Sequence, residues 1–322
     1  MGIISALASG PAKRWTALIS GGAYAFVAVV VLLLRPWRPP AARCPGSGLT
    51  AVACDAGSGE PLALAALGVL AVVAASGASL VVIALAGPLV HLLAGTALPV
   101  TGPVARLVER QVDRRVRAKR RLTARRDGAG KSRAVAEARR RLHRRPEQDM
   151  LTAPTRTGDS FAAMSERVLG RHRLDVNLCW PLLQQICDEP ARRDLERASD
   201  VVLGRARNLI WAALTAVAVP PLALLDRVPL WPAALAALGG ALVAVLLLAG
   251  LGNGVDEYTD TVEAALLRHR DALYASVAWP LPGSTGDERK TGTAFTAYLR
   301  RTDHPAPQVT FERPPPEEPP AR

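Results

Sequence analysis

Residues 230–251 read LWPAALAALGGALVAVLLLAGL, a run without a charged side chain. A helix needs about 20 apolar residues to cross the hydrocarbon core of a bilayer, so this run predicts a transmembrane helix. A buried core helix is the alternative, but only DRVP separates the run from a second apolar stretch, as in a transmembrane hairpin. We therefore expect an all-α membrane protein with four transmembrane helices, at about 16–34, 62–86 (extending past Pro88 to about 97), 209–225 and 230–251.

Two of these stretches leave an alternative open. The first follows Lys13-Arg14, as a cleaved signal sequence would, but RPWRPP stands where small residues should mark a cleavage site. We interpret it as a retained helix. Pro220-Pro221 interrupts the third stretch, which leaves open whether it crosses fully.

The charge distribution predicts the orientation. The chain is 49% hydrophobic and carries a net charge of +12. Residues 104–145 contain seventeen Lys or Arg against four acids, whereas the loop 35–61 contains three Arg against two acids. Because basic loops stay on the cytoplasmic side, we expect a multi-pass protein of the cell membrane with cytoplasmic N- and C-termini.

This orientation gives the domain order. The expected parts are an N-terminal segment (1–103) with two membrane helices and the extracytoplasmic loop, a basic cytoplasmic helical arm (104–149), a cytoplasmic helical region (150–207), the membrane hairpin (208–252), a cytoplasmic helical segment (253–301) and a disordered Pro-rich tail (302–322).

The cysteines agree with this topology. Cys44 and Cys54 lie in the loop expected outside, where they form a disulfide or remain two free thiols. Cys179 and Cys187 lie in a segment expected inside, where thiols stay reduced. The histidines and cysteines are too scattered for a metal site, so we expect no metal.

The basic arm predicts a membrane-surface helix. Apolar residues recur mostly at three- to four-residue spacing between 104 and 122, and the remainder is rich in arginine. A helix of this kind leaving a membrane lies against anionic lipid headgroups. No aromatic residue lies between 104 and 145, so we do not expect nucleic acid as a partner. The expected lipid-facing residues are Arg114, Arg115, Arg117, Lys119, Arg120, Arg121, Arg125 and Arg126.

One stretch of the arm, RRDGAGKSR at 125–133, ends like a phosphate-binding loop. Such a loop needs a glycine where Arg125 stands, and it follows a strand, whereas a basic helix is predicted here. We interpret its glycines as a turn between two helices and expect no nucleotide cofactor.

Residues 150–207 predict cytoplasmic helices, the first of them capped by Asp159 or Ser160. Beyond the last apolar stretch, Tyr258, Val262, Leu266 and Leu273 share roughly one helical face. We expect that face to pack on the helices of 150–207.

The stretches PTRTG, HRLDVNLCWPLL and LLRHRDALYASVAWPLP, between about 150 and 301, resemble a family of uncharacterised bacterial multi-pass membrane proteins. The family has an asparagine where Asp159 stands and Tyr-Gly where His172-Arg173 stand. The resemblance implies the architecture and no activity. Its motif residues predict either a cytoplasmic binding surface or intradomain packing, with Arg156 paired to Asp175 and Trp180-Pro181 anchoring a helix start. They are Pro154, Thr155, Arg156, Gly158, Leu174, Asp175, Trp180, Pro181, His269, Arg270 and Tyr274.

The sequence bears on three classes of function. The sequence has no Gly-x-Ser-x-Gly, no His-Glu-x-x-His and no paired acids in a membrane stretch, so we expect no catalytic residue and no enzyme. The membrane stretches contain no Asp, Glu, Lys or Arg, which disfavours a carrier. We expect a non-catalytic, membrane-anchored interaction or scaffold module with a protein partner at the cytoplasmic face, or a homo-oligomer. The alternative is a subunit of a small-solute or ion channel or transporter.

Overall fold

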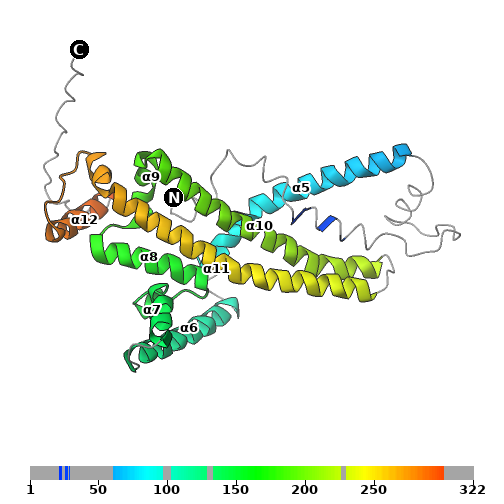
Figure 1. The fold of residues 1–322 in the computed structure, drawn as a ribbon, viewed down its shortest axis with the longest axis horizontal. Helices are drawn as coiled ribbons and strands as arrows, with labels where there is room; N and C mark the ends of the chain where they lie inside the picture. The colour runs from blue at the N-terminus through cyan, green and yellow to red at the C-terminus, as the bar shows by residue number, and fades with distance from the viewer. Residues whose placement is uncertain are drawn as a thin grey trace, which may run out of the picture. The chain divides into compact units, whose positions relative to one another are not determined.

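The computed structural model describes residues 22, 23, 26, 27, 29, 61–96, 103–128, 133–225 and 230–300. Every regular element in this part is helical, and these residues contain no strand. The all-α class is thereby confirmed for the described residues. The elements, labelled as in Figure 1, are α5 (Pro61–Ala94), α6 (Pro103–Gly128), α7 (Arg133–His143), a 3-10 turn η1 (Asp149–Leu151), α8 (Arg156–His172), α9 (Val176–Ile186), α10 (Glu189–Leu225), α11 (Leu230–Ala275) and α12 (Thr285–Arg300).

The chain forms two compact units. Of the described residues, the charged unit holds His91–Val202 and 252–300, and the apolar unit holds Leu203–Leu251 and everything before His91. Helices α10 and α11 each belong to both units, because each begins in one and ends in the other.

Three helices in the described part are long and apolar enough to cross a membrane: Val72–Ala94, Glu189–Leu224 and Leu230–Ala275. Leu235, Leu238 and Leu242 of α11 are each more than 60% exposed. Apolar surface left in water forgoes about 25 cal/mol per Å² of burial, so a lipid surround suits these faces. The predicted stretch 16–34 lies largely outside the described residues.

The predicted helix ends are partly corrected. Helix α5 runs past Pro88 to Ala94, as expected. Helix α10 continues through Pro220 and Pro221, so the predicted interruption is absent. Each proline removes one backbone donor and crowds the carbonyl four residues before it, and in an apolar helix neighbouring helices and local backbone adjustments compensate for this.

The predicted hairpin (208–252) and cytoplasmic segment (253–301) share one helix, because α11 runs unbroken from Leu230 to Ala275, and the two compact units divide within it, between Leu251 and Gly252. Within this helix, a Cβ on Gly252 would lie 3.1 Å from Cδ of Arg156. The small residue makes room for a neighbouring side chain rather than ending the helix.

Two features of the apolar unit's packing are the buried Trp211 side chain and the close approach of α10 and α11 at Gly240. Trp211 is buried with Ala23 and Val82, and its ring centroid lies 5.4 Å from that of Phe26. A Cβ on Gly240 would lie 2.9 Å from the backbone nitrogen of Ala216. The absence of a side chain at 240 therefore allows α10 and α11 to pack closely.

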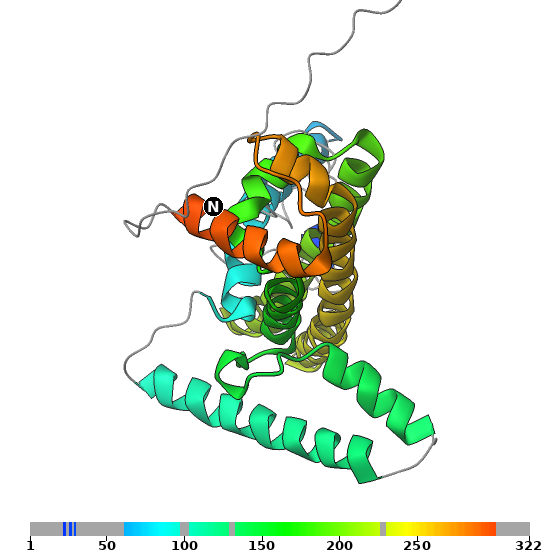
Figure 2. The ribbon, with the colours of Figure 1, turned by 90° about the vertical axis from the view of Figure 1, so that its left-hand side faces the viewer.

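The core of the charged unit confirms the predicted face of α11. Tyr258, Val262, Leu266 and Leu273 are each at most 2% exposed. The ring of Tyr258 meets that of Phe161 on α8 edge to face, with centroids 6.3 Å apart. Helices α6 and α7 of the basic arm pack against each other (Figure 2).

Two predicted helix starts are wrong. The N-cap of α8 is Thr155, whose hydroxyl accepts a hydrogen bond from the Gly158 N–H at 3.1 Å; Asp159 is engaged elsewhere. The N-cap of α9 is Asp175, so Trp180-Pro181 lie inside that helix and do not anchor its start.

Candidate functional site

The motif residues lie in two places within the charged unit. The α8-start cluster consists of Thr155, Arg156, Gly158, Asp159, Ser160 and Asp256, with Pro154 just before it. The α12 cluster consists of His172, Asp175, Arg270, Glu288, Thr296 and Arg300. The other motif residues are Leu174 in the α8–α9 connection, Trp180 and Pro181 on α9, and His269 and Tyr274 on α11.

The start of α8 is fitted to the last turn of α5. The Thr155 hydroxyl donates a hydrogen bond to the backbone oxygen of Leu93. A Cβ on Gly158 would overlap Cβ of Ala153 and come within 2.5 Å of the backbone oxygen of Ala94. Only glycine allows this approach, so the motif glycine has a packing reason.

Asp159 is the most buried charge of the α8-start cluster, with a side chain 1% exposed. It accepts hydrogen bonds from the Ala153 N–H at 2.9 Å and from Nε of Arg115 at 3.2 Å. A buried carboxylate needs such partners, because an unpaired charge in a low-dielectric interior is very unfavourable. Asp159 thus joins α8 to α6 of the basic arm.

Asp256 of α11 is the partner of Arg156. The Arg156 guanidinium donates to Asp256 at 2.7 Å and to Oδ1 of Asn253 at 2.9 Å, and the Ser160 hydroxyl donates to Asp256 at 2.5 Å. The predicted pair of Arg156 with Asp175 is therefore wrong. Helix α8 directs Arg156 toward α11, whereas Asp175 lies beyond the other end of α8.

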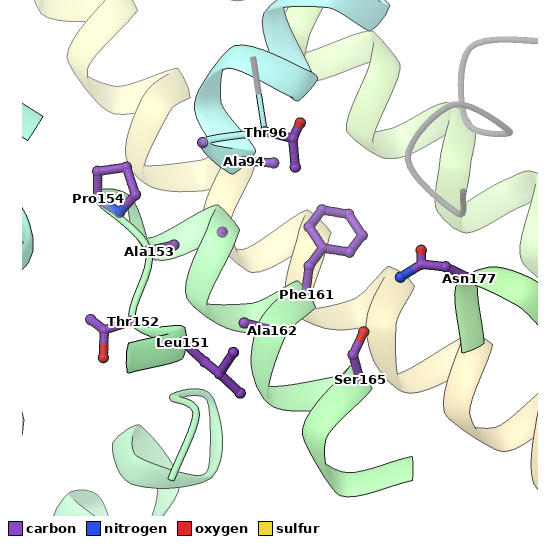
Figure 3. A pocket seen from close by; sticks show the side chains of 12 residues that line it. Ala94, Thr96, Leu151, Thr152, Ala153, Pro154, Phe161, Ala162, Ser165 and Asn177 are labelled. Carbon is purple, nitrogen blue, oxygen red and sulfur yellow. The ribbon is translucent and has the colours of Figure 1, made fainter. Parts of the chain in front are cut away.

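A cavity of about 410 Å³ adjoins the α8-start cluster (Figure 3). Its polar lining includes the hydroxyls of Thr96 and Ser165 and the amide of Asn177, and the Phe161 ring forms part of the apolar wall. None of its twelve lining residues is ionisable. The cavity has a volume that suits a small ligand, but its walls supply no acid, base or thiol.

In the α12 cluster, Glu288 links three helices. It accepts from the Arg270 guanidinium at 3.1 Å and lies 2.7 Å from Nδ1 of His172. His172 and Glu288 are both nearly fully buried. The motif residue Arg270 is thereby used in holding α12 to α8 and α11.

Helix α12 docks through one row of residues at four-residue spacing. Glu288 opens the row, and a Cβ on Gly292 would overlap the backbone oxygen of His172. The Thr296 hydroxyl donates to the Arg173 oxygen at 2.9 Å and accepts from the Asp175 N–H at 3.2 Å. The row ends at Arg300, which pairs with the Asp175 side chain at 3.1 Å.

The remaining motif residues serve packing. Leu174 and Tyr274 are fully buried, Trp180 is 3% exposed and Pro181 lies on the exposed side of α9. His269 places Nδ1 3.0 Å from the backbone oxygen of Ala265 and Nε2 3.4 Å from Asp188, the residue just before α10.

The cysteines of the charged unit are buried thiols. Burial raises the pKa of the Cys179 thiol to about 12, and burial also raises the pKa of Cys187. Neither is poised as a nucleophile, because the thiolate is the reactive form. The predicted Cys44–Cys54 bridge lies outside the described residues.

The basic arm separates into two faces, which corrects part of the predicted lipid-facing set. Lys119 is buried and donates to Asp149 at 2.8 Å, and Arg115 pairs with buried Asp159. These two cations face the protein because their positions on α6 lie on its docked side. Arg120 and Arg126 are exposed but paired with Asp149 and Asp127, respectively. Arg114, Arg117 and Arg121 are exposed, and the side chain of Arg125 lies outside the described residues.

An ion pair and a hydrogen bond also hold the C-terminal end of the basic arm to α11 and α8. Arg144 donates to both oxygens of Asp260, and Arg167 donates to the backbone oxygen of His143 at 2.9 Å. Burial, with the nearby Arg167 and Arg144, lowers the pKa of His143. Hydrogen bonds from Lys119 and Arg120 lower the pKa of Asp149.

Sequence reasoning missed Asp256 and Glu288, the two acids around which the clusters are built. No local signal marks them, because each partner lies far away in the chain or on another helix. Arg106 and Arg110 were also missed on α6, although their four-residue spacing from Arg114 was visible in the sequence.

Among the described residues, no group of three or more His, Cys, Asp or Glu side chains could hold a metal ion. Comparison with protein-family models, with curated proteins and with solved structures found no match to this chain. The resemblance of residues about 150–301 to a family of membrane proteins stays a prediction.

Proposed function

We propose that this chain is a multi-pass protein of the cell membrane with four crossings and cytoplasmic termini, and that its charged unit is a non-catalytic platform for interaction at the inner membrane face. The observation that carries the proposal is helix α11. Its first half exposes leucines along an apolar stretch, and its second half buries Tyr258, Val262 and Leu266 in the charged unit. One unbroken helix thus joins a membrane-length segment to a folded, charged bundle.

The pairing of the motif charges supports a platform. Arg156, Asp175, His269 and Arg270 each contact a partner within the charged unit. Groups held in this way stabilise an arrangement of helices, and the surface between them is then rigid enough to present to a partner. We propose that the partner is a protein at the cytoplasmic face or a second copy of the chain.

Orientation is tested with a single introduced cysteine. Met150 is 84% exposed, so Met150→Cys should react with a membrane-impermeant maleimide in inverted vesicles and not in intact cells. Cys179 and Cys187 are buried, which keeps their background low, and Cys44→Ser with Cys54→Ser removes the two thiols of the loop expected outside. Labelling of Met150→Cys in intact cells would overturn the proposed topology.

The platform itself is tested by crosslinking in native membranes followed by pull-down. We expect a reproducible protein partner or a crosslinked dimer. The charge-reversed variant Arg156→Glu serves as a structural control, because it breaks the α8-start cluster and should lose that partner. Absence of any reproducible partner, or solute flux through purified protein in proteoliposomes, would overturn the proposal in favour of a channel or transporter subunit.

A further inference from the structure

Helix α6 carries a row of five arginines that no other part of the described chain neutralises. The spacing between them is four, four, three and four residues. At about 100° per residue this spacing keeps the five side chains within roughly an 80° arc. All five are exposed, and none has a hydrogen-bond or ion-pair partner among the described residues. The row consists of Arg106, Arg110, Arg114, Arg117 and Arg121, and we call it the α6 arginine row.

The opposite side of α6 is docked on the rest of the charged unit. Val108 and Val112 are half-buried there, and Arg115 and Lys119 point the same way, toward Asp159 and Asp149. Docking fixes the rotation of the helix about its axis. The arginine row therefore faces away from the rest of the charged unit.

Contacts within the charged unit hold α6 close to the end of a membrane-length helix. Leu93 and Ala94 end α5, and both touch the start of α8 through Thr155 and Gly158. The next residue of α8, Asp159, pairs with the middle of α6. Packed helices lie about 8–10 Å apart, so the middle of α6 lies within about two helix spacings of the last turn of α5.

Two acids of α6, Glu109 and Asp113, stand beside the row but form no ion pair with it among the described residues, so the row keeps a net positive charge that a polyanion can neutralise. The phosphates of lipid headgroups, nucleic acid and acidic protein all offer one. Headgroups form a layer several ångströms thick just beyond the hydrocarbon core, which is the depth at which α5 ends if it crosses. Helix α6 has no aromatic side chain on which a base could stack. Proximity to the span and the absence of stacking groups both favour lipid.

We infer that the α6 arginine row binds the anionic headgroups of phospholipids, and that Arg115 and Lys119 of the same helix do not take part. The inference rests on the proposed function, because a cytoplasmic arm would face the anionic inner leaflet. Each arginine near such a surface should strengthen binding roughly fivefold. The attraction should weaken as salt rises.

The test uses the full-length protein in nanodiscs of phosphatidylcholine with phosphatidylglycerol. Native mass spectrometry counts the phosphatidylglycerol molecules that each protein retains. The row variant carries Arg106→Gln, Arg110→Gln, Arg114→Gln, Arg117→Gln and Arg121→Gln. The matched control removes five exposed arginines outside the arm, by Arg171→Gln, Arg192→Gln, Arg193→Gln, Arg197→Gln and Arg289→Gln, and so has the same net charge.

We expect the row variant to lose most of its retained phosphatidylglycerol and the control to keep it. The row variant should melt with the wild type, since none of its five side chains is buried or paired. Equal loss in both variants would overturn the inference, because net charge alone would then explain retention. Co-purification of nucleic acid with the wild type, lost in the row variant while phosphatidylglycerol is kept, would also overturn it and assign the row to nucleic acid.

This test is independent of topology because a nanodisc presents the same lipid on both faces. Labelling of Met150→Cys from outside intact cells would refute the proposed orientation and leave the lipid measurement unchanged. Normal orientation with no specific loss in the row variant would refute the lipid inference alone.

Discussion

Replacing Gly292 with alanine should loosen α12 from the charged unit. A Cβ at 292 would overlap the backbone oxygen of His172 and lie 3.1 Å from the carbon of the same carbonyl. A backbone carbonyl at the end of α8 cannot rotate away as a flexible side chain would. Either α12 or the α8–α9 connection must move to make room for the methyl group.

Three contributions to the free energy of unfolding set the size of the effect; one stabilises the variant and two destabilise it. Alanine gains about 1 kcal/mol over glycine in a helix interior. Overpacking against a rigid neighbour costs about 1–3 kcal/mol, and the backbone contact places Gly292 near the upper end. A shift of α12 also strains the two hydrogen bonds of Thr296, worth about 1 kcal/mol each. The net expectation is a loss of about 2–4 kcal/mol.

Thermal unfolding of the full-length protein in detergent, followed by tryptophan fluorescence, measures this loss. At about 2–4 °C per kcal/mol for a unit of this size, Gly292→Ala should lower Tm by several degrees. Gly170→Ala is the matched control, because a Cβ there would meet no atom within 4 Å, and its Tm should rise slightly. If Gly292→Ala melts at or above the wild type, the close approach of α12 to His172 is refuted.

Three further predictions concern other contacts. Asp159→Asn should lower the free energy of unfolding by about 3 kcal/mol, as breaking a buried ion pair does. Glu189→Gln, which breaks an exposed pair, should lower it by less than about 0.5 kcal/mol. Chemical unfolding of the two variants measures the difference. The pKa of His143 in the folded protein lies below its ordinary value of 6.5. The unfolded chain therefore takes up the proton first, and stability is lost as pH falls through about 6.5. Hydrogen exchange of α7 should become faster in that pH range, and His143→Gln should abolish the pH dependence. Gly240→Ala should lower Tm, because its Cβ would lie 2.9 Å from the backbone of α10. Gly239→Ala should leave Tm unchanged, because its Cβ would meet no atom within 4 Å. Equal Tm values for the two variants would contradict the close packing of α10 and α11.

The helices were largely predictable because their signals are local. Apolar runs marked α5, the second half of α10 and the first half of α11, and residue spacing identified the buried face that includes Tyr258. The ends were less predictable. The sequence favoured Asp159 or Ser160 as the cap of α8, but Thr155 is the cap, and the Asp159 carboxylate is bound by Arg115, which lies 44 residues before it.

The ion pairs between distant segments of the charged unit could not be predicted from sequence patterns. Arg156 and its acid, Asp256, are 100 residues apart, and nothing in either neighbourhood singles out the other. Proximity in sequence favoured Asp175 instead. The helix direction of α8 decides the pairing, since Arg156 is its first residue and Asp175 lies beyond its last.

The arm shows how a charge run differs from a charged face. In sequence, Arg114 to Arg121 form one dense block, and the block was predicted to face lipid as a whole. Helical geometry splits that block, because Arg115 and Lys119 lie on the docked side and acquire buried acids there. The same geometry adds Arg106 and Arg110, which lie outside the block but share the free side. Surface attraction to a membrane depends on which charges remain unneutralised and face outward, so removing Arg106 should weaken lipid binding, whereas removing Lys119 should weaken the fold.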